Sequence, residues 1–297
     1  MTSWIRKTGT ASLMGDPNAE KDKSMYYHTT DDNVAAELLN IFYSFVYANS
    51  SDAPLKVYDT SNPLMPNRGF YATTFEDISG LQFVDTQSTR FTSLNKKSMQ
   101  VLQFIHQFPV GALSHAATQV FKLRKERHEE VVNAINTMYV QGHTTSSKVA
   151  TLTKVDYDRY DIGIYIRSNS KKVPVQPYVA AIRAFQKKYQ MEKVGVFLML
   201  DDMFMVDELK KVADPSWTLY VAAPAAPKTG SSSSAAQIRA QQEKNVGFLA
   251  NISILQNIPH TITSMGSAVG KFLFLTCDDV QKFKTIDTAT FSPFVTL

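Results

Sequence analysis

The chain has 297 residues, of which 44% are hydrophobic and 20% are charged, a composition typical of a soluble globular protein with room for two domains. Its formal charge of +4 is spread along the chain without a basic arm or a block of like charges, so we expect no nucleic-acid partner. A single cysteine, Cys277, excludes an intramolecular disulfide and fits a reducing compartment.

No segment has the pattern of a targeting peptide or a membrane span. Residues 1–23 are polar and contain two glycines and a proline, so they lack the continuous apolar core of a signal peptide. No later stretch reaches the roughly 18 apolar residues that a membrane-spanning helix needs. We therefore predict a cytoplasmic protein, which would suit a bacterium or a large virus inside its host cell.

The first half of the chain predicts a strand, a helix and a second strand, the order of a βαβ unit. Ser24 to Tyr27 form the first short strand, and Asp31-Asp32-Asn33 supplies a choice of helix N-caps. Apolar side chains recur at helical spacing from Val34 to Val46, and Leu55 to Tyr58 form the second strand. Two further helical segments, 91–108 and 122–138, are expected to cover the sheet.

The second half alternates strands and helices, which is typical of a parallel α/β sheet. The predicted elements are strand 161–167, helix 177–190, strand 194–200, helix 203–212, strand 217–221, a helix ending near 255, strand 261–264 and helix 266–275. The stretch 142–158 is polar and marks a boundary. We predict a polar extension over 1–23 and two Rossmann-like domains, 24–150 and 151–297.

Two features follow predicted strands, at the edge where open α/β sheets bind ligands. Arg167 ends the apolar strand Ile162 to Ile166, and its guanidinium is shaped to clamp a phosphate; the alternative is an arginine paired with a surface carboxylate. The loop 222–234, rich in Ala, Pro and Ser, also follows a strand. It is either a mobile linker or a substrate gate.

A second candidate anion site is the turn Ser264-Met265-Gly266-Ser267, which begins the last predicted helix. Backbone N–H groups and two hydroxyls meet there at the positive end of a helix dipole. The segment through Lys271 departs from a P-loop, because its glycine spacing is one residue short and Phe272 follows the lysine. The alternative is an N-capping turn without a ligand.

Two pairs of aspartates are further candidates. Asp201 and Asp202 end the strand 194–200, where paired carboxylates serve either as acid and base or as a helix cap and a solvated neighbour. Asp156-Tyr157-Asp158 has the Asp-x-Asp form of many metal-dependent sugar transferases, but it precedes its strand. The histidines are scattered and form no zinc motif, so we expect no metal site.

The order of these pieces resembles the donor domain of GT-B fucosyltransferases, a family that includes α1,6-fucosyltransferases, nodulation fucosyltransferases and protein O-fucosyltransferases. The resemblance is carried by Ile162-Gly163-Ile164-Tyr165-Ile166-Arg167, by Val196 to Asp202 and by the turn Thr263 to Lys271. The first half is similar in the order of its elements. The chain departs from the family where Tyr165 replaces a histidine, Lys271 an arginine, and Asp31-Asp32-Asn33 a glycine-rich loop.

The resemblance implies inverting, metal-independent transfer of a sugar, most simply L-fucose, from a GDP-sugar to a glycan or glycoprotein acceptor. It implies an α/β, GT-B-like fold in which an acceptor-side domain (24–150) and a donor domain (151–297) face a central cleft. No separate cofactor is expected. The alternative is a catalytically inactive GT-B-fold binding or structural module.

The resemblance also implies roles for particular residues. Arg167 would bind the donor β-phosphate and stabilise the departing nucleotide. Asp202 or Asp32 would activate the acceptor. The remaining donor-binding residues would be Tyr165, Asn251 at the guanine position, Ser264, Gly266, Ser267 and Lys271.

Overall fold

The computed structural model describes residues 24–29, 34–58, 70–84, 92–94, 98–145, 149–166, 174–200, 203–222 and 234–287. The chain divides into two compact units. The first comprises residues 1–124 and 234–242, and the second comprises residues 125–233 and 243–297. Each unit is α/β, which confirms the fold class expected from the sequence.

The first unit is built on a four-stranded parallel sheet with the order β3-β2-β1-β4. Its strands are β1 (Met25–His28), β2 (Leu55–Tyr58), β3 (Leu81–Val84) and β4 (Thr92–Ser93). Its helices are α1 (Val34–Ser50), α2 (Phe70–Thr74), α3 (Ser98–Ile105) and α4 (Val110–Val120). The βαβ unit expected at the start of the chain is confirmed. Helix α1 lies between β1 and β2 in the sequence, and the two strands pair in parallel.

Helix α1 is the centre of the first unit. Nearly all of its side chains are buried, in agreement with its run of large apolar residues. Aromatic rings connect it to its neighbours: Tyr47 meets Phe104 of α3 edge-on at 5.3 Å, and Phe42 lies 5.7 Å from Phe121. The unit therefore has its own aromatic core.

The second unit is built on a seven-stranded sheet with the order β11-β10-β7-β8-β9-β5-β6. Its strands are β5 (Tyr139–Thr144), β6 (Thr151–Lys154), β7 (Ile162–Ile166), β8 (Val194–Leu200), β9 (Trp217–Ala222), β10 (His260–Thr263) and β11 (Phe283–Thr285). Its helices are α5 (Lys125–Thr137), α6 (Gln176–Tyr189), α7 (Phe204–Val212), most of α8 (Ser234–Asn257) and α9 (Ala268–Leu275).

The five strands from β7 to β11 are parallel, and their order is that of a Rossmann-like sheet. β7 is the first of the five in the chain and lies in the middle. β8 and β9 follow on one side of it, and β10 and β11 on the other. The strand order therefore reverses between β7 and β10.

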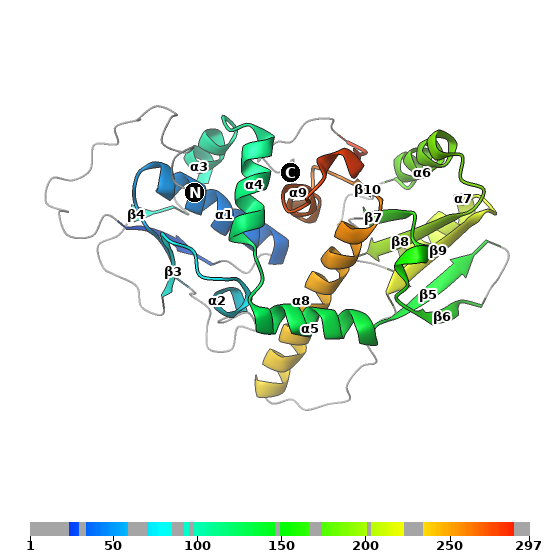
Figure 1. The fold of residues 1–297 in the computed structure, drawn as a ribbon, viewed down its shortest axis with the longest axis horizontal. Helices are drawn as coiled ribbons and strands as arrows, with labels where there is room; N and C mark the ends of the chain where they lie inside the picture. The colour runs from blue at the N-terminus through cyan, green and yellow to red at the C-terminus, as the bar shows by residue number, and fades with distance from the viewer. Residues whose placement is uncertain are drawn as a thin grey trace, which may run out of the picture. The chain divides into compact units, whose positions relative to one another are not determined.

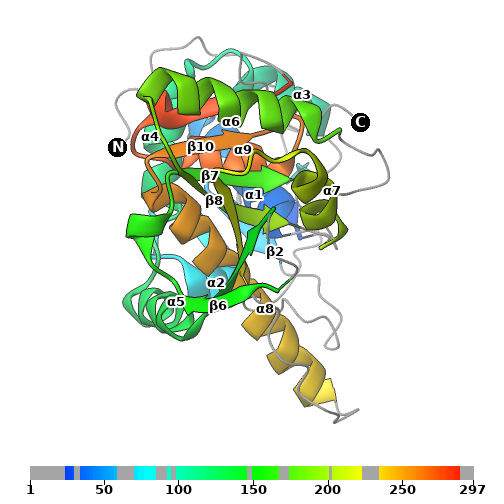
Figure 2. The same cartoon turned by 90° about the vertical axis from the view of Figure 1, so that its right-hand side faces the viewer.

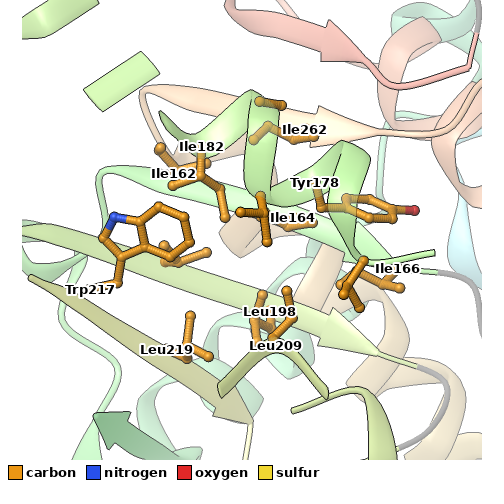
Figure 3. Packing of buried hydrophobic residues seen from close by; sticks show 14 of the residues in the cluster. Ile162, Ile164, Ile166, Tyr178, Ile182, Leu198, Leu209, Trp217, Leu219 and Ile262 are labelled. Atoms are coloured by element: carbon orange, nitrogen blue, oxygen red, sulfur yellow. The ribbon is translucent and has the colours of Figure 1, made fainter. Parts of the chain in front are cut away.

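Helices cover both faces of this sheet (Figures 1 and 2). On one face, α6 and α7 pack on the sheet through a core that includes Ile164, Tyr178, Leu198 and Leu209 (Figure 3). On the other face, α8 approaches β7 so closely that a Cβ atom at Gly163 would lie 2.6 Å from Leu255 Cδ2. A parallel sheet buried on both faces needs the nearly continuous apolar strands that the sequence contains.

The structure differs from the sequence prediction mainly around the domain boundary. The first unit ends at residue 124 and takes up the chain again over residues 234–242, whereas the sequence predicts a single boundary after residue 150. The polar stretch that suggested a linker contributes to an antiparallel pair, β5 and β6, and β5 also pairs with β9. Threonine and other polar side chains suit the exposed face of an edge strand, so their polarity did not mark a linker.

The helical predictions for the first unit need smaller corrections. Among the described residues of the segment expected to be helical from 91 to 108, only those of α3 are helical, and α4 was not predicted. The segment expected from 122 to 138 forms α5, which belongs to the second unit. None of the helices in the described part of the chain is long and apolar enough to cross a membrane.

Candidate functional site

The candidate site is the carboxyl edge of the parallel strands in the second unit. β7 ends at Ile166 and β10 at Thr263, and the two strands are hydrogen-bonded neighbours at the point where the strand order reverses. Loops that leave such neighbouring strands in opposite directions open a crevice, which is where Rossmann-like sheets bind ligands. The turn expected to bind an anion begins directly after β10.

Several predicted residues fall outside the described part of the chain. Arg167 directly follows β7, and Asp201 and Asp202 directly follow β8. Asp32 lies between β1 and α1, and the loop expected to gate the site lies outside the described residues from 223 to 233. Only the ends of the preceding strands are described for Arg167, Asp201, Asp202 and Asp32. The roles of these four residues remain predictions.

Ser267 is the N-cap of α9. Its hydroxyl accepts a hydrogen bond from Gly270 N at 2.9 Å and donates one to the carbonyl oxygen of Ser264 at 2.9 Å. The side chain is 1% exposed. This geometry satisfies one of the unpaired N–H groups of the first helical turn, and it matches the N-capping alternative for this serine.

The donors at the start of the turn hold a carboxylate that the sequence prediction missed. Asp287 follows β11, and its carboxylate accepts hydrogen bonds from Ser264 Oγ, from Met265 N at 2.9 Å and from Gly266 N at 2.7 Å. Partial desolvation raises the pKa of Asp287, but these hydrogen bonds outweigh it and the pKa lies below its usual value. The turn therefore binds an oxyanion, and that oxyanion belongs to the chain itself.

Lys271 lies one helical turn after Ser267 and is 1% exposed. Burial lowers the pKa of its ammonium to about 8, and the charge of Asp287 acts in the opposite direction. Burial penalises the charged form and the negative charge of Asp287 favours it, and at a pKa of about 8 the ammonium is mostly protonated at neutral pH. The lysine predicted to contact donor phosphates is thus a buried cation associated with Asp287.

Tyr165 and Asn251 belong to the face of the sheet covered by α8. Tyr165 is 3% exposed and lies two residues after Gly163, so both point to the same face of β7. Asn251 lies one turn before Leu255 on α8, and Leu255 packs against Gly163. Within the described residues, Asn251 Nδ2 donates to Gly247 O at 3.0 Å, and the buried Oδ1 atom accepts no hydrogen bond. An acceptor is therefore available at the position where the resemblance implies guanine recognition.

The aspartates of the Asp-x-Asp motif have a local structural role. Asp156 caps the short 3-10 helix Tyr157–Arg159, with Oδ1 accepting from Asp158 N at 3.3 Å and Oδ2 from Arg159 Nε at 2.8 Å. The motif precedes β7, so it belongs to the amino end of that strand. Over the described residues, no three His, Cys, Asp or Glu side chains form a group that could hold a metal ion.

Comparison with solved structures gives fucosyltransferases, at low sequence identity. A mutant of Arabidopsis thaliana FUT1 in complex with GDP is 12% identical, the alignment covers 89% of this chain and 70% of that one, and the TM-score is 0.49. The fucosyltransferase NodZ from Bradyrhizobium is 13% identical, with 86% and 94% covered and a TM-score of 0.47. NodZ α1,6-fucosyltransferase soaked with GDP-fucose gives 12% identity, 86% and 93% coverage and a TM-score of 0.46.

At the level of sequence, no protein-family model matches this chain and no curated protein matches it.

Proposed function

We propose that this protein is a glycosyltransferase that transfers a sugar, most simply L-fucose, from a GDP-sugar to a glycan or glycoprotein acceptor, with inversion and without a metal. The observation that carries the proposal is the strand order of the second unit. Because β7 and β10 are neighbours at the reversal, Arg167 and the Ser264–Ser267 turn follow adjacent strands at the same edge.

The turn supports an anionic ligand because it already stabilises negative charge. A carboxylate and a phosphate accept the same kind of hydrogen bond, and the turn donates two amide N–H groups and a hydroxyl to the two oxygens of one carboxylate. In the proposed complex, Arg167 binds the β-phosphate and stabilises the departing nucleotide, which is the charge that develops during sugar transfer. Asn251 Oδ1 accepts a hydrogen bond from the base.

The general base that removes the proton of the acceptor hydroxyl is proposed to be an aspartate. We propose that Asp202 or Asp32 accepts the proton of the acceptor hydroxyl as the sugar is transferred. Each follows a parallel strand of its own unit, β8 or β1, at a carboxyl end. Replacing either by Asn would remove the base while keeping its shape, so the loss of transfer by only one variant identifies the base.

One observation favours the alternative, a catalytically inactive module. Asp287 fills the turn, and Ser267 is engaged as a helix cap, so both groups expected to contact phosphate have partners within the chain. An inactive module would retain these contacts as structural ones. Nucleotide binding and transfer therefore have to be measured separately.

The test is calorimetry and thermal unfolding of the wild type and of Arg167→Ala with GDP, UDP and GDP-fucose. A ligand at 100 times its dissociation constant adds about 2.7 kcal/mol of stability. We expect GDP and GDP-fucose to stabilise the wild type and Arg167→Ala to lose most of this effect. Arg183→Ala is the matched control, because it removes an exposed arginine from α6.

Two results would contradict the proposed metal-independent glycosyltransferase. If no nucleotide stabilises or binds the wild type, the enzyme proposal fails and the inactive module stands. If activity with GDP-fucose disappears when EDTA is added, the metal-independent mechanism is wrong, and a metal-dependent transferase using Asp156 and Asp158 is favoured instead.

A further inference from the structure

We propose that Asp287 is a built-in competitor for the anion that binds at the β10–α9 turn. Its carboxylate occupies the donors of Ser264, Met265 and Gly266 until a phosphate group displaces it. The inference rests on the proposed function, because the displacing anion is the diphosphate of the nucleotide donor. It adds a residue that neither the motifs nor the resemblance indicated.

The contacts are those of an anion in a binding site. Both oxygens of Asp287 are used: Oδ1 accepts from Met265 N at 2.9 Å, and Oδ2 accepts from Gly266 N at 2.7 Å and from Ser264 Oγ. The three donors come from consecutive residues, and the carboxylate comes from a strand end more than 20 residues further along the chain. Hydrogen bonds to an ionised acceptor are about twice as strong as neutral ones.

The sheet register brings Asp287 to the turn. Thr285 of β11 is paired with Thr263 of β10, and Ile286 N donates to the carbonyl oxygen of Thr263 at 3.1 Å. Asp287 is the next residue, so it has a high effective concentration at the turn. An external anion must overcome this intramolecular advantage, so we expect the wild type to bind it less tightly than a chain without the carboxylate would.

The strand that carries Asp287 is suited to release it. β11 has three residues and is the terminal strand of the sheet, paired with β10 alone among the described strands. Asp287 itself is exposed to solvent. Displacement of the Asp287 side chain therefore breaks hydrogen bonds at the surface, at the end of one short strand.

The buried charge of Lys271 explains why one anion replaces another. This ammonium is in the electrostatic range of Asp287 and has almost no contact with water. Loss of the carboxylate without a substitute would remove a negative charge that favours the protonated form of this buried lysine. A phosphate in the turn supplies the negative charge that Asp287 gives up.

The proposal is tested by titrating inorganic pyrophosphate and GDP into the wild type, Asp287→Asn, Asp287→Ala and Asp278→Asn. Asp287→Asn keeps the shape of the side chain and removes its charge. Asp278→Asn is the matched control, because it removes the same charge from an exposed residue after α9. Calorimetry gives the dissociation constants, and thermal unfolding shows that each variant is folded.

We expect pyrophosphate to bind both Asp287 variants about tenfold more tightly than the wild type, since the anion no longer has to break a charge-assisted hydrogen bond. The control should bind as the wild type does. If the folded Asp287 variants bind pyrophosphate as tightly as the wild type or less tightly, the proposal is overturned. Asp287 then only stabilises the folded turn.

A second measurement decides the matter even if the variants do not fold. The backbone amide signals of Met265 and Gly266 in the wild type are followed by NMR as pyrophosphate is added, and we expect both to shift as the carboxylate is replaced. Unmoved signals overturn the competitor proposal even if GDP binds elsewhere. If Asp287→Asn binds pyrophosphate more tightly but GDP does not bind at all, the competitor role of Asp287 is supported. The proposal that the protein binds a GDP-sugar is then refuted.

Discussion

A Cβ atom added to Gly270 would lie 2.1 Å from the carbonyl oxygen of Ser264. Real Cβ atoms do not approach backbone oxygens so closely, so only glycine allows α9 to begin directly against the turn that precedes it. The same added atom would lie 2.8 Å from Ser267 Oγ, the capping group of the helix. The shape of the candidate anion site thus depends on the absence of one side chain.

Gly270→Ala should therefore destabilise the protein. We expect the free energy of unfolding to fall by about 1–3 kcal/mol, as for other substitutions that overpack a rigid site. Urea unfolding measures the change. Gly247→Ala in α8 is the control, because no atom lies within 4 Å of the added Cβ; it should raise stability by about 0.5–1 kcal/mol. An unchanged midpoint for Gly270→Ala would mean that the turn relaxes freely.

Lys271 should make stability rise with pH in the alkaline range. Its pKa is about 8 in the folded protein, against a usual value of 10.5. Between these values the unfolded chain binds more protons than the folded one, so the free energy of unfolding increases with pH. Lys271→Met removes this titration. The stability of the wild type relative to Lys271→Met should increase as the pH rises from 8 toward 10.5, and a constant difference would contradict the prediction.

His260 should have the corresponding effect in acid. Its ring stacks on Phe185 at 4.7 Å and on Tyr189 at 4.3 Å. Burial and the charge of Lys188 lower the pKa of His260 below 6.5, and Asp161 opposes the shift. The folded state therefore binds fewer protons than the unfolded state, and stability falls as the pH drops below 6.5.

His260→Phe keeps an aromatic ring in the stack and removes the titration. Urea unfolding at neutral and mildly acidic pH should show a smaller loss of stability for this variant than for the wild type. The comparison is needed because burial also lowers the pKa of His28 and His143. If both proteins lose the same stability, the acid sensitivity arises at those histidines.

Gln190→Gly should stabilise the end of α6. Gln190 is the C-cap and has φ 54° and ψ 40°, the left-handed conformation in which a side chain costs roughly 1–2 kcal/mol. Glycine removes this strain but loses more backbone entropy on folding, so the expected gain in unfolding free energy is at most about 1 kcal/mol. Lys187→Gly, in the last turn of the same helix, should lower it by about 1 kcal/mol.

The elements that sequence predicts well are those that a single apolar pattern defines. The strands β7 and β8, buried on both faces, read as continuous apolar runs, and α1 has an uninterrupted helical periodicity. Helix α4 was missed because its small residues give no clear stripe, and β6 because its polar residues suit an edge strand as well as a loop. In both cases tertiary packing decides the structure.

The same distinction applies to the site. The role of Ser267 as a helix cap depends on local sequence. A serine directly before the first residue of a predicted helix already indicates an N-cap. Asp287 is bound through the pairing of β11 with β10, and no spacing along the chain reveals that register. Lys271 was expected to contact phosphate because of its position near the turn, whereas the winding of α9 turns its side chain into the interior.

The neighbouring strands β7 and β10 are far apart in the chain, because α6, β8, α7, β9 and α8 all come between them. During synthesis, β7 and β8 can pair as soon as both have left the ribosome, but the partner on the other side of β7 arrives much later. Until then β7 is an edge strand, and the two halves of the candidate anion site belong to different stages of folding. The strand pairing that creates the crevice is therefore among the last long-range contacts to form, and a chain truncated before β10 would retain Arg167 without the turn that is proposed to complete its site.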